Sequence, residues 1–515
     1  MNLRTRRSFF VPGMCCAQLF GRFIGYSDIF AFRSNDYRIL NFMTHQANFP
    51  QVNGHVPFEV SRTLLEKYNQ AVPRYTSYPP ANLFGPFHSS SYRQALEASN
   101  GQKPDNISIY IHIPFCHKIC FYCGCNSTRM GQTEQVNAYV DAICRELEMV
   151  RQHLAPHRKV SQIHYGGGTP NAIAHTHLNR INRLIFDLFP MAEQPEIAIE
   201  CHPGYLNEEY IKALVDARFN RVSLGIQDFN LQVLKTVNRD PSRLPVDEVM
   251  RLFRKYNADV KINLDFIYGL PGQSPESFAQ TVSQAIAHAP DRIVTFSYAH
   301  VPWIKKYQEA LDRAGLPAPD IKLKMFETGF RLMAEGGYRE VGMDHFARPD
   351  DEMVKALDSG TLHRNFQGYC TRQTTGQVYA FGVSGISQLH RHYVQNTKDI
   401  TLYIDTISRG EFAVEKGVAL SDSEVVVREV INSLMCNRFV LWDELETVLG
   451  VDAAEIRRIV HFRDEDFVGL VDDGLVEVSD QGVRVTSVGR FFIRNVAVMF
   501  DPAFKGGNLT YSKSV

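Results

Sequence analysis

Three cysteines with the spacing C-x3-C-x2-C constrain this chain more than any other feature of its sequence: Cys116, Cys120 and Cys123. Three thiolates can hold three irons of a cubane [4Fe–4S] cluster and leave the fourth iron open, whereas a site with four cysteines is closed to other ligands. A zinc site and a group of buried thiols are the alternatives. Zinc motifs usually pair two C-x2-C or C-x2-C/H-x3-H units, and the sequence shows no second pair. The spacing therefore predicts an iron–sulfur cluster with one open iron.

The composition limits the partners and the compartment. With 515 residues, 44% hydrophobic and 22% charged, the chain can bury a large core in two or three domains. A formal net charge of −1 gives no electrostatic reason to expect a nucleic acid or an anionic membrane as partner. Ten cysteines in this length are not a disulfide scaffold, and a thiolate-bound cluster indicates a reducing compartment, so we expect a cytoplasmic protein. No apolar run reaches the length of about 18 residues that would predict a transmembrane helix.

The first 42 residues differ from the rest of the chain. They contain Arg4, Arg6 and Arg7, and no acidic residue occurs before Asp28. This composition is typical of an organellar transit peptide. It also suits a stretch translated from a start codon placed too far upstream, with Met43 as the true start. We favour the second interpretation because the segment has no clean amphipathic period.

From about residue 98 the sequence alternates between strand and helix patterns. Six strands separated by helices predict a parallel sheet with right-handed crossovers, either open or curled into a partial barrel. The candidate strands are the alternating isoleucines 107–113, and Gln162–Tyr165, Glu196–Glu200, Arg221–Gly225, Val260–Phe266 and Arg292–Phe296. Chemistry gathers at the C-terminal ends of the strands in such folds. The cysteine loop, Gly166–Pro170, Glu200, Gln227 and Asp265 all fall at those ends.

The sequence pattern changes after about residue 390, and this change predicts a second domain. Helical stretches such as Ser423–Ser433 and Ala453–Val460 precede two short apolar runs that flank a turn at Ser479–Gly482, which indicates a hairpin. Helices followed by a hairpin suggest a small winged-helix-like domain. Because the region has no basic patch, we expect it to cover the main domain rather than to bind DNA.

Some polar residues at the strand ends have two interpretations from the sequence alone. The triplet Gly166–Gly168 would let the backbone approach a ligand closely, but a tight turn is the commoner cause of such glycines. Glu200 and Asp265 end apolar strands, where an ionised carboxylate needs a partner, either a ligand or a structural arginine. Tyr110 and His112 share a face of the first strand and are equally compatible with core packing.

Several motifs together resemble those of the oxygen-independent coproporphyrinogen III oxidases, which are radical S-adenosylmethionine (SAM) enzymes. The resemblance covers roughly residues 60 to 505, and the first 42 residues have no counterpart. The matching motifs are Pro73–Pro79, Ser108–Cys116, the cysteine loop to Cys125, His164–Pro170, Gly225–Phe229, Asp265–Pro271, Gly342–Pro349 and His363–Tyr369. The fold that this resemblance implies is α/β, a partial (β/α)6 radical SAM barrel with a smaller, mostly helical C-terminal domain.

The resemblance also implies roles for particular residues. Cys116, Cys120 and Cys123 would ligate the cluster, and a first SAM would chelate the open iron. The family holds a second SAM as well. Contacts to the first SAM would come from Tyr110, Gly167, Glu200 and Ile386, and contacts to the second from Gly168, Thr169, Gln227, Arg239, Asp265 and Ala299.

The implied reaction is the oxidative decarboxylation of two propionates of coproporphyrinogen III to vinyl groups, which gives protoporphyrinogen IX in haem biosynthesis. The radical comes from the cofactors, so no catalytic side chain is expected beyond them. The substrate carries four carboxylates, for which Arg74, His345, Arg348 and Arg364 are the candidate partners. A flavodoxin or ferredoxin would donate electrons, the final acceptor is not specified, and we expect a monomer.

Two other activities compete with this one. The nearer alternative is a haem chaperone of the same superfamily, which usually carries an aromatic residue where this chain has Cys125. The more distant one is a radical SAM enzyme that acts on another tetrapyrrole. Cys125 and the motif at His363–Tyr369 favour the oxidase.

The predicted domain organisation follows from these patterns. It comprises a non-native or transit-like extension (1–42), a segment that covers the substrate (43–97), the partial barrel (98–330), a segment that closes the barrel beside the substrate (331–390), and the C-terminal domain (391–515).

Overall fold

The six predicted strands form the parallel centre of one large sheet. In the computed structural model, which describes residues 60–371, 377–504 and 511, they pair in chain order with every neighbour parallel. Their bounds are β2 (Asn106–Ile113), β5 (Lys159–Gly167), β6 (Met191–Cys201), β7 (Arg221–Gln227), β8 (Lys261–Tyr268) and β9 (Arg292–Ser297). The predicted parallel sheet is confirmed, and the predicted 1–42 extension lies outside the described residues.

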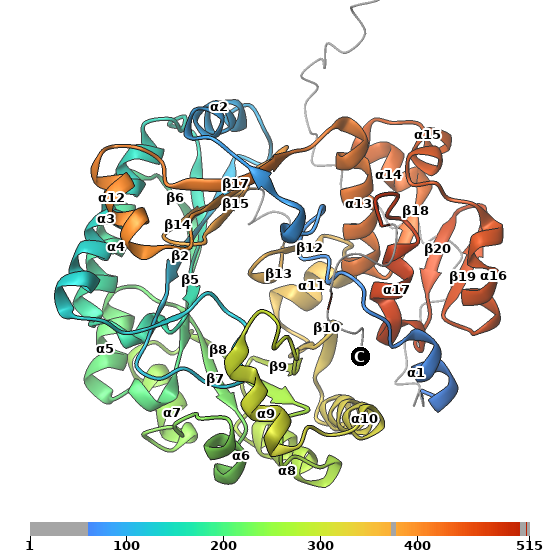
Figure 1. Ribbon diagram of the computed structural model, residues 1–515, viewed down its shortest axis with the longest axis horizontal. Helices are drawn as coiled ribbons and strands as arrows, with labels where there is room; N and C mark the ends of the chain where they lie inside the picture. The colour runs from blue at the N-terminus through green and yellow to red at the C-terminus, as the bar shows by residue number, and fades with distance from the viewer. Residues whose placement is uncertain (1–59, 372–376, 505–510, 512–515) are drawn as a thin grey trace, which may run out of the picture. The chain divides into compact units, whose positions relative to one another are not determined.

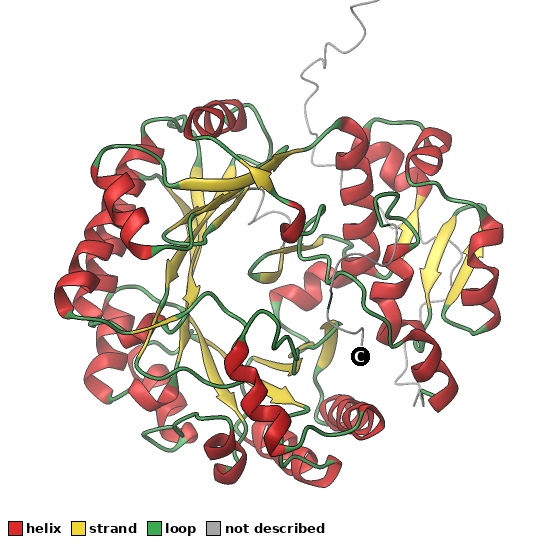
Figure 2. Cartoon of the chain, viewed as in Figure 1, coloured by secondary structure: helices red, strands yellow, loops and turns green. Residues whose placement is uncertain are grey.

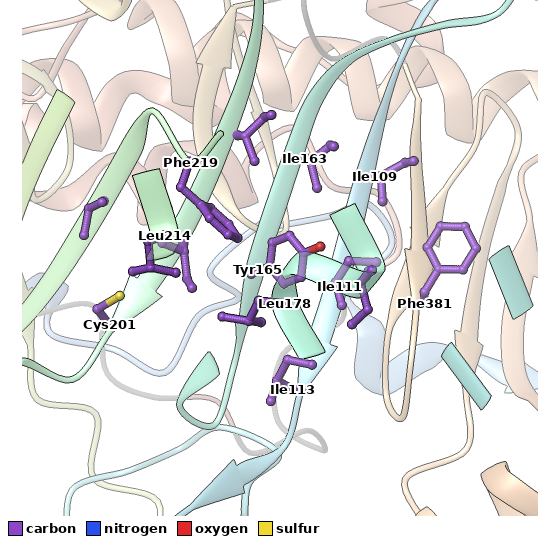
Figure 3. Packing of buried hydrophobic residues seen from close by; sticks show 14 of the residues in the cluster. Ile109, Ile111, Ile113, Ile163, Tyr165, Leu178, Cys201, Leu214, Phe219 and Phe381 are labelled. Atoms are coloured by element: carbon purple, nitrogen blue, oxygen red, sulfur yellow. The ribbon is translucent and has the colours of Figure 1, made fainter. Parts of the chain in front are cut away.

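Helices between these strands cover one face of the sheet (Figures 1 and 2). The odd positions of β2 and β5, such as Ile109, Ile111 and Ile163, pack against the helices, and these side chains are almost fully buried. Figure 3 shows this apolar layer between sheet and helices. The even positions face the other side and are polar, as period-2 alternation requires. The covering helices are α3 (Thr133–Arg151), α4 (His175–Leu188), α5 (Glu208–Asp216), α6 (Leu231–Thr236), α7 (Val246–Tyr256) and α8 (Pro275–Ala287).

The sheet extends beyond the six strands to thirteen. On one side β14 (Val378–Phe381) is parallel to β2, and antiparallel strands follow it: β15 (Ile386–Gln388), β16 (His392–Asn396), β17 (Val414–Ala419) and β1 (Gly85–Pro86). On the other side lie β11 (His345–Ala347) and β10 (Arg339–Gly342). The predicted boundary at residue 391 therefore needs correction, because β16 and β17 are hydrogen-bonded strands of the large sheet.

A second hydrophobic core begins with α13 (Asp422–Asn437). A capping box at Ser421 and Glu424 starts this helix. The predicted hairpin is present, since β19 (Val476–Ser479) pairs antiparallel with β20 (Gly482–Val485), which also pairs with β18 (Phe439–Leu441). The same core includes Leu65 and Tyr68 of the N-terminal helix α1 (Arg62–Tyr68). Its other helices are α14 (Trp442–Leu449), α15 (Ala453–Ile459), α16 (Asp464–Asp472) and α17 (Ile493–Val498).

The described chain contains further helices, strands and turns besides these. They are α2 (Ser89–Ser99), α9 (Glu309–Ala314), α10 (Pro319–Glu335), α11 (Glu352–Asp358), α12 (Ile400–Ser408), the hairpin β12 (Leu362–Asn365) and β13 (Gly368–Thr371), the short pair β3 (Phe115–Cys116) and β4 (Thr128–Arg129), and the 3-10 turns Ala81–Leu83, Pro170–Ala172, Pro203–Tyr205, Lys306–Gln308 and Gly489–Phe492. None of the helices in the described part of the chain is both long and apolar enough to cross a membrane.

Candidate functional site

The cysteine loop leaves the C-terminal end of β2 and is tied to the end of β5. The Thr169 N–H donates to the Phe115 carbonyl at 3.0 Å, and the Cys116 Sγ lies 3.3 Å from the Thr169 hydroxyl. The Arg239 Nη1 lies 3.6 Å from the Cys120 Sγ. Four residues that were predicted from the sequence, Cys116, Cys120, Thr169 and Arg239, are thereby brought together.

The far side of the loop is held by the segment that follows β9. The Tyr307 hydroxyl donates to the Cys123 carbonyl at 2.6 Å, and the Lys305 Nζ donates to the Cys125 carbonyl at 2.7 Å. Cys116 and Cys120 are buried, Cys123 is half-buried and Cys125 is exposed. Across the described residues no three His, Cys, Asp or Glu side chains converge on a single metal ion. Each thiolate of a cubane cluster binds a different iron, so its ligands need not meet at one point.

The glycine triplet at the end of β5 is explained by close neighbours. A Cβ at Gly168 would lie 2.4 Å from the Pro114 carbonyl oxygen and 3.0 Å from the Cys116 Sγ. A Cβ at Gly166 would lie 2.8 Å from the Glu200 Oε1. Gly167 has a φ of +117°, which other residues rarely adopt. The triplet thus allows the cysteine loop and Glu200 to approach the strand closely.

Glu200, at the end of β6, is oriented by a histidine rather than by an arginine. The His164 Nε2 lies 3.0 Å from the Glu200 Oε1, and the Tyr110 ring stacks on the His164 ring with centroids 6.0 Å apart. The Tyr110 hydroxyl in turn lies 3.2 Å from the His112 Nδ1. His164 was not among the site residues predicted from the sequence, although it precedes Gly166 by two positions and so shares its face of β5.

Asp265, on β8, is half-buried among neutral donors. Its carboxylate accepts hydrogen bonds from the Ser223 hydroxyl and, at 2.7 Å, from the Asn263 Nδ2. Burial raises the pKa of Asp265 to about 6, and the nearby charge of Glu200 adds to the effect. A carboxylate in this setting is suited to accept further hydrogen bonds from a ligand.

Glu200 and Asp265 line one cavity with residues from the distal motifs. The lining includes Phe296 at the end of β9, His345 of β11, and Asn365 and Tyr369 of the β12–β13 hairpin. The cavity therefore joins residues of the parallel strands to residues of β11 and the β12–β13 hairpin, which come later in the chain.

Gln227 and Arg239 lie together beside Gly225 of β7, near the cysteine loop. Arg239 is buried and donates to the Gly225 carbonyl as well as to Cys120. Gln227 has a φ of +70°, and its buried Oε1 has no hydrogen-bond partner within the described chain. An orphaned buried acceptor at a strand end is suited to a bound donor.

Two other residues predicted to contact SAM have less direct support. The Ala299 carbonyl accepts a hydrogen bond from the Gln308 Nε2 at 3.4 Å, close to the segment that holds the cysteine loop. Ile386 begins β15 and packs with Phe84 and Tyr393. Neither residue lines the cavity that contains Glu200 and Asp265.

Three of the four candidates for binding substrate carboxylates lie at the cavity or beside it. His345 lines the cavity, and its ring lies edge-on to Tyr369, with centroids 5.1 Å apart. The Arg364 guanidinium lies over the Tyr369 ring at 5.5 Å and donates to the Arg74 carbonyl at 3.0 Å.

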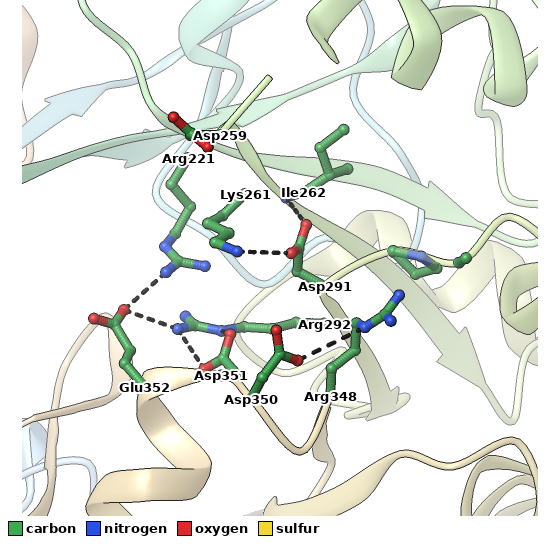
Figure 4. Close-up of polar contacts among 12 residues, drawn as sticks. Arg221, Asp259, Lys261, Ile262, Asp291, Arg292, Arg348, Asp350, Asp351 and Glu352 are labelled. Atoms are coloured by element: carbon green, nitrogen blue, oxygen red, sulfur yellow. Dashed lines mark hydrogen bonds and ion pairs between the residues drawn. The ribbon is translucent and has the colours of Figure 1, made fainter. Parts of the chain in front are cut away.

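The prediction that Arg348 lies at the barrel mouth, where it would bind a substrate carboxylate, needs correction. It follows Ala347, which pairs with Arg292 at the N-terminal end of β9. Its Nε lies 3.8 Å from the Asp350 Oδ1, as Figure 4 shows. It therefore lies level with Asp291, just before the start of β9, whereas Asp265 and His345 lie further along the sheet, level with Val294.

A network of ion pairs occupies that N-terminal end (Figure 4). Arg292 makes two hydrogen bonds of 2.8 Å to Asp351, and its Nη2 lies 3.0 Å from Glu352. Arg221 bridges Glu352 at 2.8 Å and Glu196 at 2.5 Å. Burial alone would raise the pKa of Glu196, but Arg221 and Arg292 outweigh it and lower that pKa to about 2.

Comparison with known proteins places this geometry in context. The family model described as "Radical SAM superfamily" matches residues 110–285, which contain the second half of β2, the cysteine loop and the strands β5 to β8. An oxygen-independent coproporphyrinogen III oxidase from Synechocystis is 40% identical over 446 residues, covering 86% of this chain and 95% of the relative. The corresponding protein of Escherichia coli is 38% identical over 447 residues, covering 85% and 94%.

A solved structure supports the same relationship. The coproporphyrinogen III oxidase from Escherichia coli, described as a radical SAM enzyme, superposes with a TM-score of 0.80 at 35% identity. The match covers 87% of this chain and all of that one.

Proposed function

The chain belongs to the oxygen-independent coproporphyrinogen III oxidases of the radical SAM superfamily, and from this premise we propose how its residues share the reaction. It oxidises coproporphyrinogen III without oxygen in haem biosynthesis, and membership of the superfamily implies a [4Fe–4S] cluster and SAM. In this reaction two propionates lose CO2 and become vinyl groups. When bound, the cluster and SAM supply the radical that removes a hydrogen atom from the propionate.

We assign the cluster to Cys116, Cys120 and Cys123. The fit is supported by the glycine at 168, because any side chain there would meet both Pro114 and the Cys116 Sγ. Arg239 beside Cys120 places a positive charge next to a thiolate-bound cluster. Cys125 is left as a non-ligand, since a fourth cysteine ligand would close the iron that SAM must reach.

We propose that two SAM molecules bind at the C-terminal side of the sheet and that each contacts a different set of residues. Tyr110, Gly167, Glu200 and Ile386 would contact the first. Gly168, Thr169, Gln227, Arg239, Asp265 and Ala299 would contact the second. In support, Glu200 and Asp265 are carboxylates without an arginine partner, and Gln227 keeps a buried acceptor oxygen unused within the described residues.

The finer features of the architecture are proposals as well. The six parallel strands would form a partial (β/α)6 barrel that keeps water and oxygen from the radical. The part with the second core would be a winged-helix-like cover. We also propose a cytoplasmic monomer that receives electrons from a flavodoxin or ferredoxin.

The main support for this assignment is that the residues of both groups line one cavity. The cavity places Glu200, near the end of β6, and Asp265, in the C-terminal half of β8, against His345, Asn365 and Tyr369 of the distal motifs. The cofactor residues and the substrate residues of one oxidase would have to meet in this way.

An anaerobic assay tests the proposal. The reduced, cluster-loaded protein with SAM should convert coproporphyrinogen III to protoporphyrinogen IX, and methionine and 5′-deoxyadenosine should form with the product. Cys116→Ser, Cys120→Ser and Cys123→Ser should each lose iron, because a hydroxyl is a poor ligand for this soft cluster. Cys125→Ser is the matched control and should keep the iron–sulfur absorbance. Tight haem binding without conversion of substrate would instead indicate a chaperone.

A further inference from the structure

Four cationic side chains lie near one another at the C-terminal ends of β8 and β9, and nothing above explains why all four are there. The first is Lys322 of α10. Its Nζ donates to the carbonyl of Tyr298, just after β9, at 3.2 Å. Its stem lies against Gly269, just after β8, where a Cβ would be 3.1 Å from the Lys322 Cδ.

The second core supplies Arg494, and the β12–β13 hairpin supplies Arg364. The Arg494 guanidinium donates to the carbonyls of Val72 and, at 3.0 Å, Pro73. The Arg364 Nη1 donates to the next two carbonyls, of Arg74 at 3.0 Å and Tyr75 at 3.3 Å. Two buried guanidinium groups therefore fix the backbone on either side of Arg74.

Within the described part of the chain, little negative charge lies beside these residues. Asp344 is the carboxylate that the structure places next to them, with its Oδ2 3.8 Å from the Arg74 Nη2. Burial, together with repulsion from Arg74 and Arg494, lowers the pKa of Lys322 to about 8. Burial and repulsion from Arg74 and Arg364 lower the pKa of Arg494 to about 9. Buried like charges are costly unless an anion joins them.

The group also retains unused hydrogen-bond donors. Lys322 uses one of its three donors on Tyr298. Among the described residues, the Arg364 Nε and Nη2 make no hydrogen bond, and the 3.8 Å contact of Arg74 is longer than a hydrogen bond. Guanidinium and ammonium donors in this number match a carboxylate.

We propose that Arg74, Lys322, Arg364 and Arg494, hereafter the cationic site, bind a propionate carboxylate of the tetrapyrrole substrate. The site adjoins the cavity, because the Arg364 guanidinium lies over the ring of Tyr369, which lines it. A carboxylate bound here would place the rest of the tetrapyrrole towards Asp265 and Glu200. The inference rests on the proposed function, and it adds Lys322 and Arg494 to the residues that bind substrate.

The test uses coproporphyrin III, the oxidised and unreactive form that keeps all four propionates, titrated by fluorescence into the cluster-loaded protein. The wild-type protein should bind the acid, and it should bind coproporphyrin III tetramethyl ester far more weakly. Lys322→Met and Arg74→Gln should each weaken binding of the acid roughly 10- to 100-fold, as expected for the loss of a charge-assisted hydrogen bond. They should change binding of the ester little, and Lys322→Arg should restore most of the affinity.

Arg348→Gln is the matched control, since it removes an arginine from the opposite end of β9 and should leave the affinity unchanged. SAM also has a carboxylate, so SAM binding is titrated in the same variants and should stay as in wild type. Arg494→Met also releases Val72 and Pro73, so Lys322→Met and Arg74→Gln carry the test.

The outcomes separate this inference from the proposed function. Wild-type affinity for coproporphyrin III in both Lys322→Met and Arg74→Gln, in a protein that converts coproporphyrinogen III, would overturn the cationic site alone. Loss of SAM affinity with unchanged coproporphyrin binding would assign these residues to SAM and also overturn it. A wild-type protein that neither binds coproporphyrin III nor converts coproporphyrinogen III would overturn the proposed function itself.

Discussion

Buried charged residues occur at both ends of the parallel strands, and the two ends differ in charge balance. At the N-terminal end, Arg221 and Arg292 are matched by Glu196, Asp351 and Glu352. At the C-terminal end, the carboxylate that lies beside the four cations of the cationic site, among the residues that the structure describes, is Asp344. Balanced charge of this kind connects elements of the fold. Unbalanced charge leaves a place for a ligand of the opposite sign.

Two half-buried carboxylates show the same contrast. Glu196 and Asp265 both face the cavity, but Arg221 and Arg292 lower the pKa of Glu196 to about 2, whereas burial raises that of Asp265 to about 6. The difference is the presence of a cationic partner. Substitutions at the two ends should therefore differ in their effects on stability and on ligand binding.

The largest change in stability is expected from Arg292→Leu, in the ion-pair network at the N-terminal end of the strands. This change leaves the buried Asp351 without its two-bond partner, and breaking a buried ion pair costs about 3–5 kcal/mol. Urea denaturation followed by circular dichroism should show the loss of stability. A loss below about 1 kcal/mol would mean that the network contributes little to the fold.

Lys322→Met, in the cationic site at the C-terminal end of the strands, should instead increase the stability of the protein. The pKa of Lys322 falls from 10.5 to about 8 on folding, so the unfolded chain binds more protons between these two pH values. Stability should therefore rise with pH across that window, and below pH 8 the folded protein carries the full cost. Removing the charge should stabilise the ligand-free protein by roughly 2–3 kcal/mol at pH 7 and abolish the rise between pH 8 and 10. Denaturation of both proteins at several pH values measures this, and an unchanged pH dependence in Lys322→Met would contradict it.

A smaller effect should appear in the pH dependence of SAM binding. The raised pKa of Asp265 means that this carboxyl becomes protonated as pH falls through about 6, with Glu200 favouring and His345 opposing the proton. If the ionised form accepts the SAM hydroxyls, affinity should fall about tenfold between pH 7.5 and pH 5. Asp265→Asn should remove this step, as measured by calorimetric titration. Persistence of the step in Asp265→Asn would assign it to another group.

The smallest effect is expected from Arg348→Gln. Its guanidinium is half-exposed and contacts Asp350 at 3.8 Å, a weak surface interaction. Stability should change by less than about 0.5 kcal/mol, and substrate turnover should not change. A large loss of turnover would show that the charges at the N-terminal end also act on the reaction.

The sequence predicted the elements that depend on local patterns. The isoleucine alternation in β2, the helix at Ser423–Ser433 and the hairpin around Ser479–Gly482 all depend on neighbours in the chain, and all three are present. Glu200 lies at the end of β6, as predicted from the parallel order of the strands, whereas β8 continues beyond Asp265 to Tyr268. Pairings between distant segments could not be predicted in this way, which is why β16 and β17 were assigned to the wrong domain.

Residues that act through distant contacts were missed for the same reason. Nothing near Lys322 or Arg494 in the sequence distinguishes them from solvated surface cations, and their burial depends on helices α10 and α17 meeting the segment at Arg74. Arg348 shows the reverse case. It belongs to a motif that resembles the family, but the antiparallel direction of β11 carries it to the other end of β9.

The edges of the large sheet bear on how this protein behaves at high concentration. One edge is β1, only two residues long and ending in Pro86, which has no backbone N–H to offer a neighbour. The other is β10, four residues long with an irregular register against β11, and its Glu340 is paired with Arg438 and Arg490. Short, proline-containing or irregular edges resist strand addition by a second chain. A sheet of thirteen strands can thus stay in solution without growing into a larger assembly through its backbone.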